Sequence, residues 1–244
     1  DSEEIVLARL LQAKGLGEDD TSIIVAPLGG RHVNYFWRLL NGLEVPYVTL
    51  LDLDLGRYQG GWGRVKYAAK QILALGKPIK GLTEASIEAL PKWNGSDHIM
   101  TSELGKKWLN WLEGRGVFFS SPLDLDFAML RRYSDAYGLS AAELAPPDDS
   151  TLTAVLGKKR HGIEQYNDEH QKHFAAYHRR FKLGSKPAEH LAALAELDNQ
   201  NRKTADELQQ ALATPPAGRP DCAREPLPSG ALRLLQPAQL LALQ

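Results

Sequence analysis

The chain has 244 residues, of which 43% are apolar and 24% charged, so it is long enough to bury one large core or two smaller ones. Its 29 Lys and Arg nearly cancel its 30 Asp and Glu, which excludes general polycationic character and leaves any nucleic-acid contact to a local basic surface. The single Cys222 excludes internal disulfides and cysteine-cluster zinc sites. Neither an apolar run of bilayer-spanning length nor a secretory leader is recognisable, so we expect a cytoplasmic protein without a membrane partner.

The first part of the chain alternates between helix and strand patterns. An amphipathic helix is predicted over Ile5–Leu16, with Asp1-Ser2-Glu3-Glu4 at its start. A helix that opens an α/β unit normally follows a strand, so we expect a first strand upstream of these residues. A strand over Ser22–Leu28, a helix over Val33–Leu43 and a buried strand over Val45–Leu51 come next. This order predicts an α/β fold with a parallel sheet flanked by helices.

Two acids close the second of these strands. Asp52 and Asp54 follow the apolar run Val45–Leu51, and a buried parallel strand carries charge at its carboxyl end rather than in its middle. In an extended segment residues i and i+2 point the same way, which leaves room for a divalent cation beside both carboxylates. A glycine-rich loop with Arg57 and Arg64 follows, and arginine beside a metal indicates a phosphate substrate.

A second acidic cluster follows a later strand. Helices are predicted over Val65–Leu75, Glu84–Leu90 and Ser102–Glu113, before a strand over Gly116–Phe119. That strand leads into Asp124 and Asp126. Because the carboxyl ends of parallel strands lie on one edge of a sheet, we expect these acids to meet Glu3, Asp52 and Asp54 in space. Several converging carboxylates can hold the two hard cations that phosphodiester cleavage uses.

The composition changes to helix formers beyond residue 130. Helices are predicted over Leu125–Tyr137, Ser140–Leu144, Ala154–Leu156, Asp168–Phe181, Pro187–Leu197 and Thr204–Ala213. A basic turn, Gly157-Lys158-Lys159-Arg160-His161-Gly162, interrupts them, and the segment after Leu212 is rich in proline and simple in composition. We therefore divide the chain into an α/β catalytic domain (1–130), an α-helical subdomain that contributes the basic turn (131–212) and an irregular tail (213–244).

Four blocks of the sequence carry a family resemblance. They are Gly29–Leu40, Asp52–Arg57 with its Gly-Gly-Trp-Gly-Arg extension, Phe118–Asp126 and Val155–Lys158. Together they resemble the carboxyl-terminal part of OLD-family (overcoming lysogenisation defect) endonucleases, over roughly residues 1 to 200. The resemblance implies a Toprim catalytic domain with a helical addition. It also implies metal-dependent nicking and cleavage of DNA by two Mg²⁺ or Mn²⁺ ions.

The resemblance assigns roles position by position. Asp52 and Asp54 match the Asp-x-Asp pair of the family, Glu3 matches an acid that follows an upstream Glu, and Lys158 matches a catalytic lysine. The implied catalytic residues are therefore Glu3, Asp52, Asp54 and Lys158. The implied metal ligands are Glu3, Asp52, Asp54, Asp124 and Asp126.

The expected partners follow from the charges and from the resemblance. The DNA contacts that we expect are Arg57, Arg64, Lys66, Lys159 and Arg160, which would hold phosphates without strong sequence readout. Family members also carry an amino-terminal ATPase region, but no Gly-x-x-x-x-Gly-Lys-Ser/Thr occurs in these residues, which predicts no ATP site here. The resemblance thus implies the nuclease half of an ATPase–nuclease protein, with a role in phage defence and a helicase-like partner.

Alternatives remain open at this stage. Asp124 also suits the N-cap of a helix that begins near Leu125, Glu3 suits the first turn of a helix, and Lys158 suits a solvated turn. An Asp-x-Asp motif after an apolar strand also occurs in phosphatases of the haloacid-dehalogenase kind. A nucleic-acid-binding module without chemistry is the third function consistent with the sequence.

Overall fold

The fold contains a short two-stranded parallel sheet. The computed structural model describes residues 2–14, 16, 23–28, 33–76, 79–182 and 186–213. Within them, strand β1 (Thr49–Asp52) pairs with strand β2 (Val117–Ser120). Thr49 lies opposite Val117 and Asp52 lies opposite Ser120, so both acidic segments leave the sheet at the same edge. The expected α/β class, with parallel strands flanked by helices, is confirmed.

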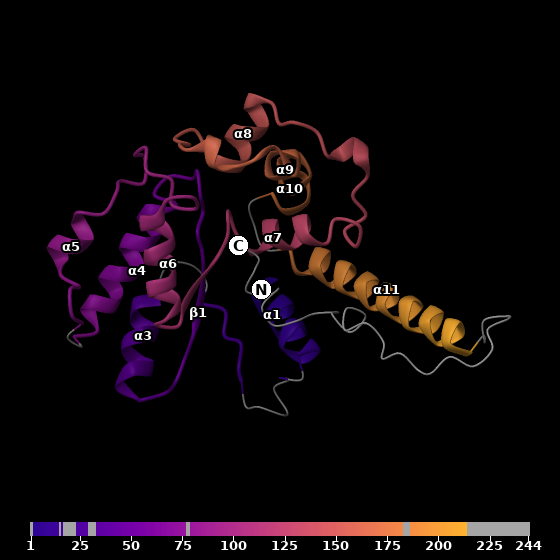
Figure 1. Ribbon diagram of the computed structural model, residues 1–244, viewed down its shortest axis with the longest axis horizontal. Helices are drawn as coiled ribbons and strands as arrows, with labels where there is room; N and C mark the ends of the chain where they lie inside the picture. The colour runs from indigo at the N-terminus through magenta and orange to yellow at the C-terminus, as the bar shows by residue number, and fades with distance from the viewer. Residues whose placement is uncertain are drawn as a thin grey trace, which may run out of the picture.

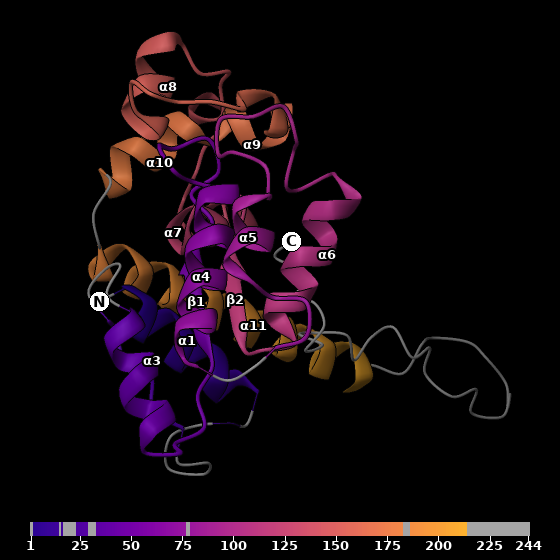
Figure 2. The ribbon, with the colours of Figure 1, turned by 90° about the vertical axis from the view of Figure 1, so that its left-hand side faces the viewer.

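Helices surround this ladder in three groups. On one side of β1 lie α3 (Val33–Gly42), α4 (Trp62–Ala74), α5 (Glu84–Glu88) and α6 (Glu103–Glu113), as Figure 1 shows. On the other side lie α1 (Ser2–Ala13) and the long α11 (Pro187–Ala213), and Figure 2 shows α3 and α4 in front of the strands. The third group is α7 (Leu125–Arg132), α8 (Asp149–Leu156), α9 (Asp168–Lys172) and α10 (Phe174–Phe181), with short 3-10 helices at Ala141–Glu143 and Ile163–Gln165. This third group sits over the edge of the sheet where the acids emerge.

The strands are shorter than the sequence predicts. The apolar run that begins at Val45 enters the ladder only at Thr49, and Val45 and Val48 remain 45% and 74% exposed. Residues 23–28, which belong to the strand predicted over Ser22–Leu28, have no regular structure, while Ser22 lies outside the described residues. Apolar composition therefore indicated strand correctly only where a partner strand supplies the hydrogen bonds.

The helices also differ from expectation at two points. The helix predicted over Asp168–Phe181 is divided at His173. The ring Nδ1 of His173 donates to the Glu169 carbonyl at 2.8 Å, and its backbone N–H donates to the His170 carbonyl at 3.1 Å. The side chain thus takes the carbonyl that a continuous helix would use. In contrast, the two helices predicted between Pro187 and Ala213 form one, because the polar residues between them include neither Gly nor Pro.

One apolar core runs through the described chain. It joins Leu53 beside β1 to Phe127 on α7 and Phe174 on α10, all of which are fully buried. The core therefore continues across the predicted boundary at residues 130/131, and the domain division stays a prediction. Of the tail predicted over 213–244, residues 214–244 lie outside the described ranges. Within the described ranges, no helix has the length and apolarity needed to cross a bilayer.

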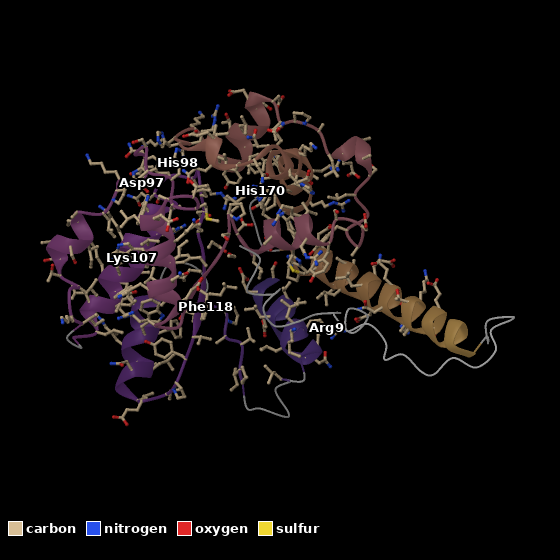
Figure 3. The ribbon with its side chains drawn as sticks, viewed as in Figure 1. Arg9, Asp97, His98, Lys107, Phe118 and His170 are labelled. Carbon is tan, nitrogen blue, oxygen red and sulfur yellow. The ribbon has the colours of Figure 1, made fainter. Side chains whose placement is uncertain are left out.

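The first helix is attached to the last one. Ser2 Oγ accepts a hydrogen bond from the backbone of Lys186 at 3.1 Å, and Arg9 pairs with Asp198. Figure 3 shows Arg9 between α1 and α11. These contacts place the start of α1, which carries Glu3, at the side of the sheet opposite α3.

Candidate active site

The end of β1 places Asp52 beside the second strand. Ser120 donates its hydroxyl hydrogen to Asp52 Oδ1 at 2.8 Å, across the ladder register that pairs the two residues. The chain then leaves the ladder: Leu53 N–H bonds the Ser120 carbonyl at 3.0 Å, and Asp54 N–H bonds the Leu123 carbonyl at 2.7 Å. Asp54 has φ = 51°, so the two acids do not sit on one extended segment as the sequence predicted. Asp52 instead ends the strand, and Asp54 begins the turn that follows it.

The glycine loop folds back over Asp54. Gly61 N–H bonds the Leu53 carbonyl at 2.7 Å, and Arg57 N–H bonds the Asp54 carbonyl at 3.0 Å. A Cβ atom at Gly60 would lie 1.7 Å from the Asp54 carbonyl oxygen, so only glycine permits this approach. The loop thereby buries Asp54, which is 5% exposed.

Asp124 is shared between a helix cap and the acid cluster. Its Oδ1 accepts the Phe127 N–H at 2.9 Å, so the N-cap role considered from the sequence is correct. Its Oδ2 accepts from the Tyr177 hydroxyl at 2.5 Å and from Arg57 Nη1 at 3.0 Å. One carboxylate therefore starts α7 with one oxygen and faces Asp54 and its arginines with the other.

Two arginines hold the acids together. Arg57 Nη1 lies 2.7 Å from Asp54 Oδ1 as well as 3.0 Å from Asp124 Oδ2, and Arg64 pairs with Asp54 Oδ2. On its far side Arg57 donates to the Val155 carbonyl at 3.1 Å and to the Tyr177 hydroxyl at 3.0 Å. Arg57 thus joins the glycine loop to α8 and α10.

The acids act on one another electrostatically. Burial raises the pKa of Asp52 to about 7, with further increases from Asp124, Asp54 and Glu3 and an opposing effect of the Ser120 hydrogen bond. Burial also raises the pKa of Asp124, although Arg57, Tyr177 and the Phe127 N–H oppose it. Acids from three separate segments therefore lie close enough for their charges to interact.

The acid cluster fits a divalent cation only in part. Its carboxylate oxygens are the hard donors that Mg²⁺ and Mn²⁺ take. However, both oxygens of Asp54 are bonded to arginine, and both oxygens of Asp124 have donors. Among the described residues, no three His, Cys, Asp or Glu side chains are grouped to hold a metal ion. The donor chemistry suits a metal, whereas the arginine-paired arrangement does not.

Asp126 faces away from Asp54 and toward α11. Its Oδ1 lies 2.8 Å from Nε2 of the fully buried His190, and Nδ1 of that ring lies 2.6 Å from the Tyr137 hydroxyl. With Nε2 protonated, His190 donates to Asp126 and accepts from Tyr137. The structure thus places Asp126 in a separate network that fastens α7 to α11, and its predicted metal role is untested.

The basic turn docks on the glycine loop. His161 N–H bonds the Gly56 carbonyl at 3.1 Å, and Lys159 Nζ lies 4.8 Å from the centre of the Tyr58 ring. Lys158 is exposed on the same turn. The turn that carries Lys158, the expected catalytic lysine, therefore lies against the loop that follows Asp54.

The remaining expected DNA contacts are engaged elsewhere. Arg160 donates to Thr153 Oγ1 at 2.8 Å and pairs with Asp149. Lys66, on α4, donates to the Glu88 carbonyl at 3.1 Å. Neither side chain contacts the acid cluster.

Two tyrosines beside the site were missed by the sequence reasoning. Tyr177 bonds both Asp124 and Arg57, but it lies in an apolar stretch of α10 and no local pattern ties it to an acid 53 residues earlier. Tyr58 is 48% exposed in the glycine loop. Its position next to Arg57, in a loop expected to bind phosphate, is a sequence signal that could have indicated a base-stacking residue.

The comparisons with known proteins bear on the first part of the chain. Residues 1–54 match the family described as overcoming lysogenization defect protein-like, TOPRIM domain. Residues 1–54 are therefore similar to an OLD-like Toprim domain. The resemblance predicted from the sequence is confirmed there, and the segment contains Glu3, Asp52 and Asp54. The match supports a nuclease-type Toprim module.

One solved structure aligns with most of this chain at low identity. A solved structure titled as the C-terminal region of the Xanthomonas campestris pv. campestris OLD protein phased with platinum aligns with 85% of this chain and 92% of its own. The identity is 16% and the TM-score is 0.38, a level that carries no conclusion about function. No curated protein is significantly similar in sequence.

Proposed function

We propose that this chain is the nuclease part of a larger OLD-like protein and that it cleaves phosphodiester bonds of DNA. The observation that carries the proposal is the OLD-like Toprim match over residues 1–54, which ends at the Asp-x-Asp pair of Asp52 and Asp54. The burial of Asp52 and its proximity to Asp124 and Glu3 support it, because burial, with added repulsion from the other acids, raises the pKa of Asp52 to about 7. Such perturbed acids are typical of catalytic sites.

The proposed cofactor is Mg²⁺ or Mn²⁺, in the pair that the family resemblance implies. The carboxylates of Glu3, Asp52, Asp54 and Asp124 offer the oxygen donors that these ions prefer. Asp126 is the weakest of the proposed ligands, since His190 holds its Oδ1. The arginine-paired cluster has to rearrange before it can enclose an ion.

The proposed DNA contacts surround the glycine loop. Lys158 is positioned on an exposed turn where it can offset charge on a phosphate, the role proposed for it in catalysis. Lys159 and Tyr58 offer a cation beside an exposed ring, a combination that suits a phosphate and a stacked base of a single strand. Arg57, Arg64, Lys66 and Arg160 complete the proposed phosphate-binding set.

The wider setting is also a proposal. An amino-terminal ATPase region of the same full-length protein, a helicase-like partner and a role in phage defence are proposed from the OLD-like resemblance alone. The cytoplasmic location expected from the sequence is proposed with them. The division of the chain into 1–130, 131–212 and 213–244 belongs to the same proposal.

A supercoiled plasmid assay separates this function from its alternatives. Nicked and linear products that appear with Mg²⁺ or Mn²⁺ and disappear with EDTA are the expected result. Turnover of an aryl phosphate without DNA cleavage would favour a haloacid-dehalogenase-like phosphatase. Metal-independent DNA binding with a steep salt dependence and no products would favour a non-catalytic binding module.

A further inference from the structure

A single nitrogen of Arg57 joins carboxylates from two segments. Arg57 Nη1 lies 2.7 Å from Asp54 Oδ1 and 3.0 Å from Asp124 Oδ2. Carboxylate oxygens are also the donors that ions of the magnesium type prefer, so Arg57 and such an ion would compete for the same two oxygens. The guanidinium group of Arg57 is therefore one cause of the misfit between the acid cluster and a divalent cation.

The ion pairs around Asp54 and Asp124 permit a divalent cation to replace Arg57. These two carboxylates face two guanidinium groups, those of Arg57 and Arg64. A divalent cation in place of Arg57, with Arg64 retained, would keep both carboxylates beside a positive charge. Exchange of one internal cation for another also avoids leaving buried carboxylates without a partner.

Contacts outside the acids keep Arg57 in the cluster. Its Nε donates to the Val155 carbonyl at 3.1 Å, and its Nη2 donates to the Tyr177 hydroxyl at 3.0 Å. Tyr177 is 1% exposed and also donates to Asp124, so it fixes both members of the ion pair. The helices α8 and α10 thus control whether Arg57 stays among the acids.

We propose that Arg57 is an internal counter-ion that closes the acid cluster, and that a divalent cation binds as Arg57 leaves Asp54 and Asp124. The identity of the ion rests on the proposed function, and the inference concerns regulation of that same site. Release of Arg57 also frees the glycine loop from Val155 and Tyr177. Cation binding is therefore coupled to the contact between the glycine loop and the helices α8 and α10.

Binding of Mn²⁺ to the whole chain, measured by calorimetry without DNA, tests this competition. Arg57→Gln removes the charge and is expected to bind Mn²⁺ about tenfold more tightly than the unchanged protein. Arg57→Lys keeps a charge but loses the planar fork that reaches both acids, so an intermediate affinity is expected. The control is Arg38→Gln on the exposed face of α3, which makes the same change in net charge and should alter the affinity less than about twofold.

The outcomes separate this inference from the proposed function. Equal affinity in Arg57→Gln and the unchanged protein, or no binding to either, overturns the inference. If Arg57→Gln does not fold, Tyr177→Phe decides, because it removes one tether of Arg57 and should still tighten Mn²⁺ binding. No increase in Tyr177→Phe then overturns the inference. Tighter binding by Arg57→Gln without any DNA cleavage by any form of the chain contradicts the proposed function alone.

Discussion

Removal of the Tyr177 hydroxyl should destabilise the protein by about 2 kcal/mol. The group donates to Asp124 Oδ2 at 2.5 Å and accepts from Arg57 Nη2 at 3.0 Å, and hydrogen bonds to charged groups contribute about 1.5 to 3 kcal/mol each. The loss should be about that of one such bond rather than two, because Asp124 and Arg57 remain bonded to each other in Tyr177→Phe. The ring stays packed against Phe127 and Phe181, at 5.6 and 5.7 Å between centroids, so the variant isolates the hydroxyl.

Urea unfolding followed by far-UV circular dichroism measures this loss. Tyr35→Phe is the matched control, since Tyr35 is 67% exposed on α3 and should change the free energy of unfolding by less than about 0.5 kcal/mol. A loss below about 0.5 kcal/mol in Tyr177→Phe, with an unchanged denaturant slope, would refute the hydrogen-bonded network around Arg57.

Three further outcomes follow from the geometry. Gly60→Ala should open the glycine loop and destabilise the protein by more than about 2 kcal/mol in urea unfolding, since the new methyl group would lie 1.7 Å from the Asp54 carbonyl oxygen. The control Gly42→Ala should be nearly neutral, because no atom lies within 4 Å of the added methyl group. Equal effects of the two substitutions would contradict the loop geometry. Burial lowers the pKa of His170 from 6.5 to about 4, with Arg131 and His173 adding to the effect, so His170 stabilises the fold fully above pH 6.5 and progressively less as the pH falls toward 4. Figure 3 shows His170 within the third group of helices, which contains α9 and α10. Between pH 7 and pH 4 the free energy of unfolding should therefore fall by about 2 kcal/mol more in the unchanged protein than in His170→Gln, after discounting for partial exposure. If the free energies of unfolding of the two proteins change with pH in parallel, this reasoning is wrong. Tyr58→Ala should weaken binding of a single-stranded oligonucleotide about tenfold in fluorescence anisotropy, whereas Tyr35→Ala should not; equal losses would remove Tyr58 as a stacking residue.

The sequence predicted the local features of the site well. An apolar run closed by acids located the end of β1 at Asp52, and the switch to a helix pattern located α7 behind Asp124. Both signals are local, because a strand end and a helix cap depend on a few adjacent residues. The glycine content of the loop also indicated a close backbone contact, since Gly60 passes over the Asp54 carbonyl where no side chain fits.

The partners of these residues could not be predicted from the sequence. Arg57 was expected to face DNA, yet it bonds Tyr177, which lies 120 residues later, and the Val155 carbonyl. Asp126 was expected among the metal ligands, yet His190 holds it from α11. Both contacts depend on how α8, α10 and α11 pack over the sheet edge, which a single sequence does not specify. The same limit applies to Val48, which has a high strand propensity but lies outside β1 and is 74% exposed.

The most direct test of the account is plasmid nicking by Asp52→Asn. Asp52 closes β1, bonds Ser120 and has a pKa of about 7 through burial and the surrounding acids, and the amide keeps its size but not its charge. The control is Asp135→Asn, an exposed residue in the turn after α7. We expect Asp52→Asn to lose Mg²⁺- or Mn²⁺-dependent nicking at least about 100-fold while Asp135→Asn keeps it. Undiminished nicking by a folded Asp52→Asn protein would contradict the central claim that these acids form the catalytic site.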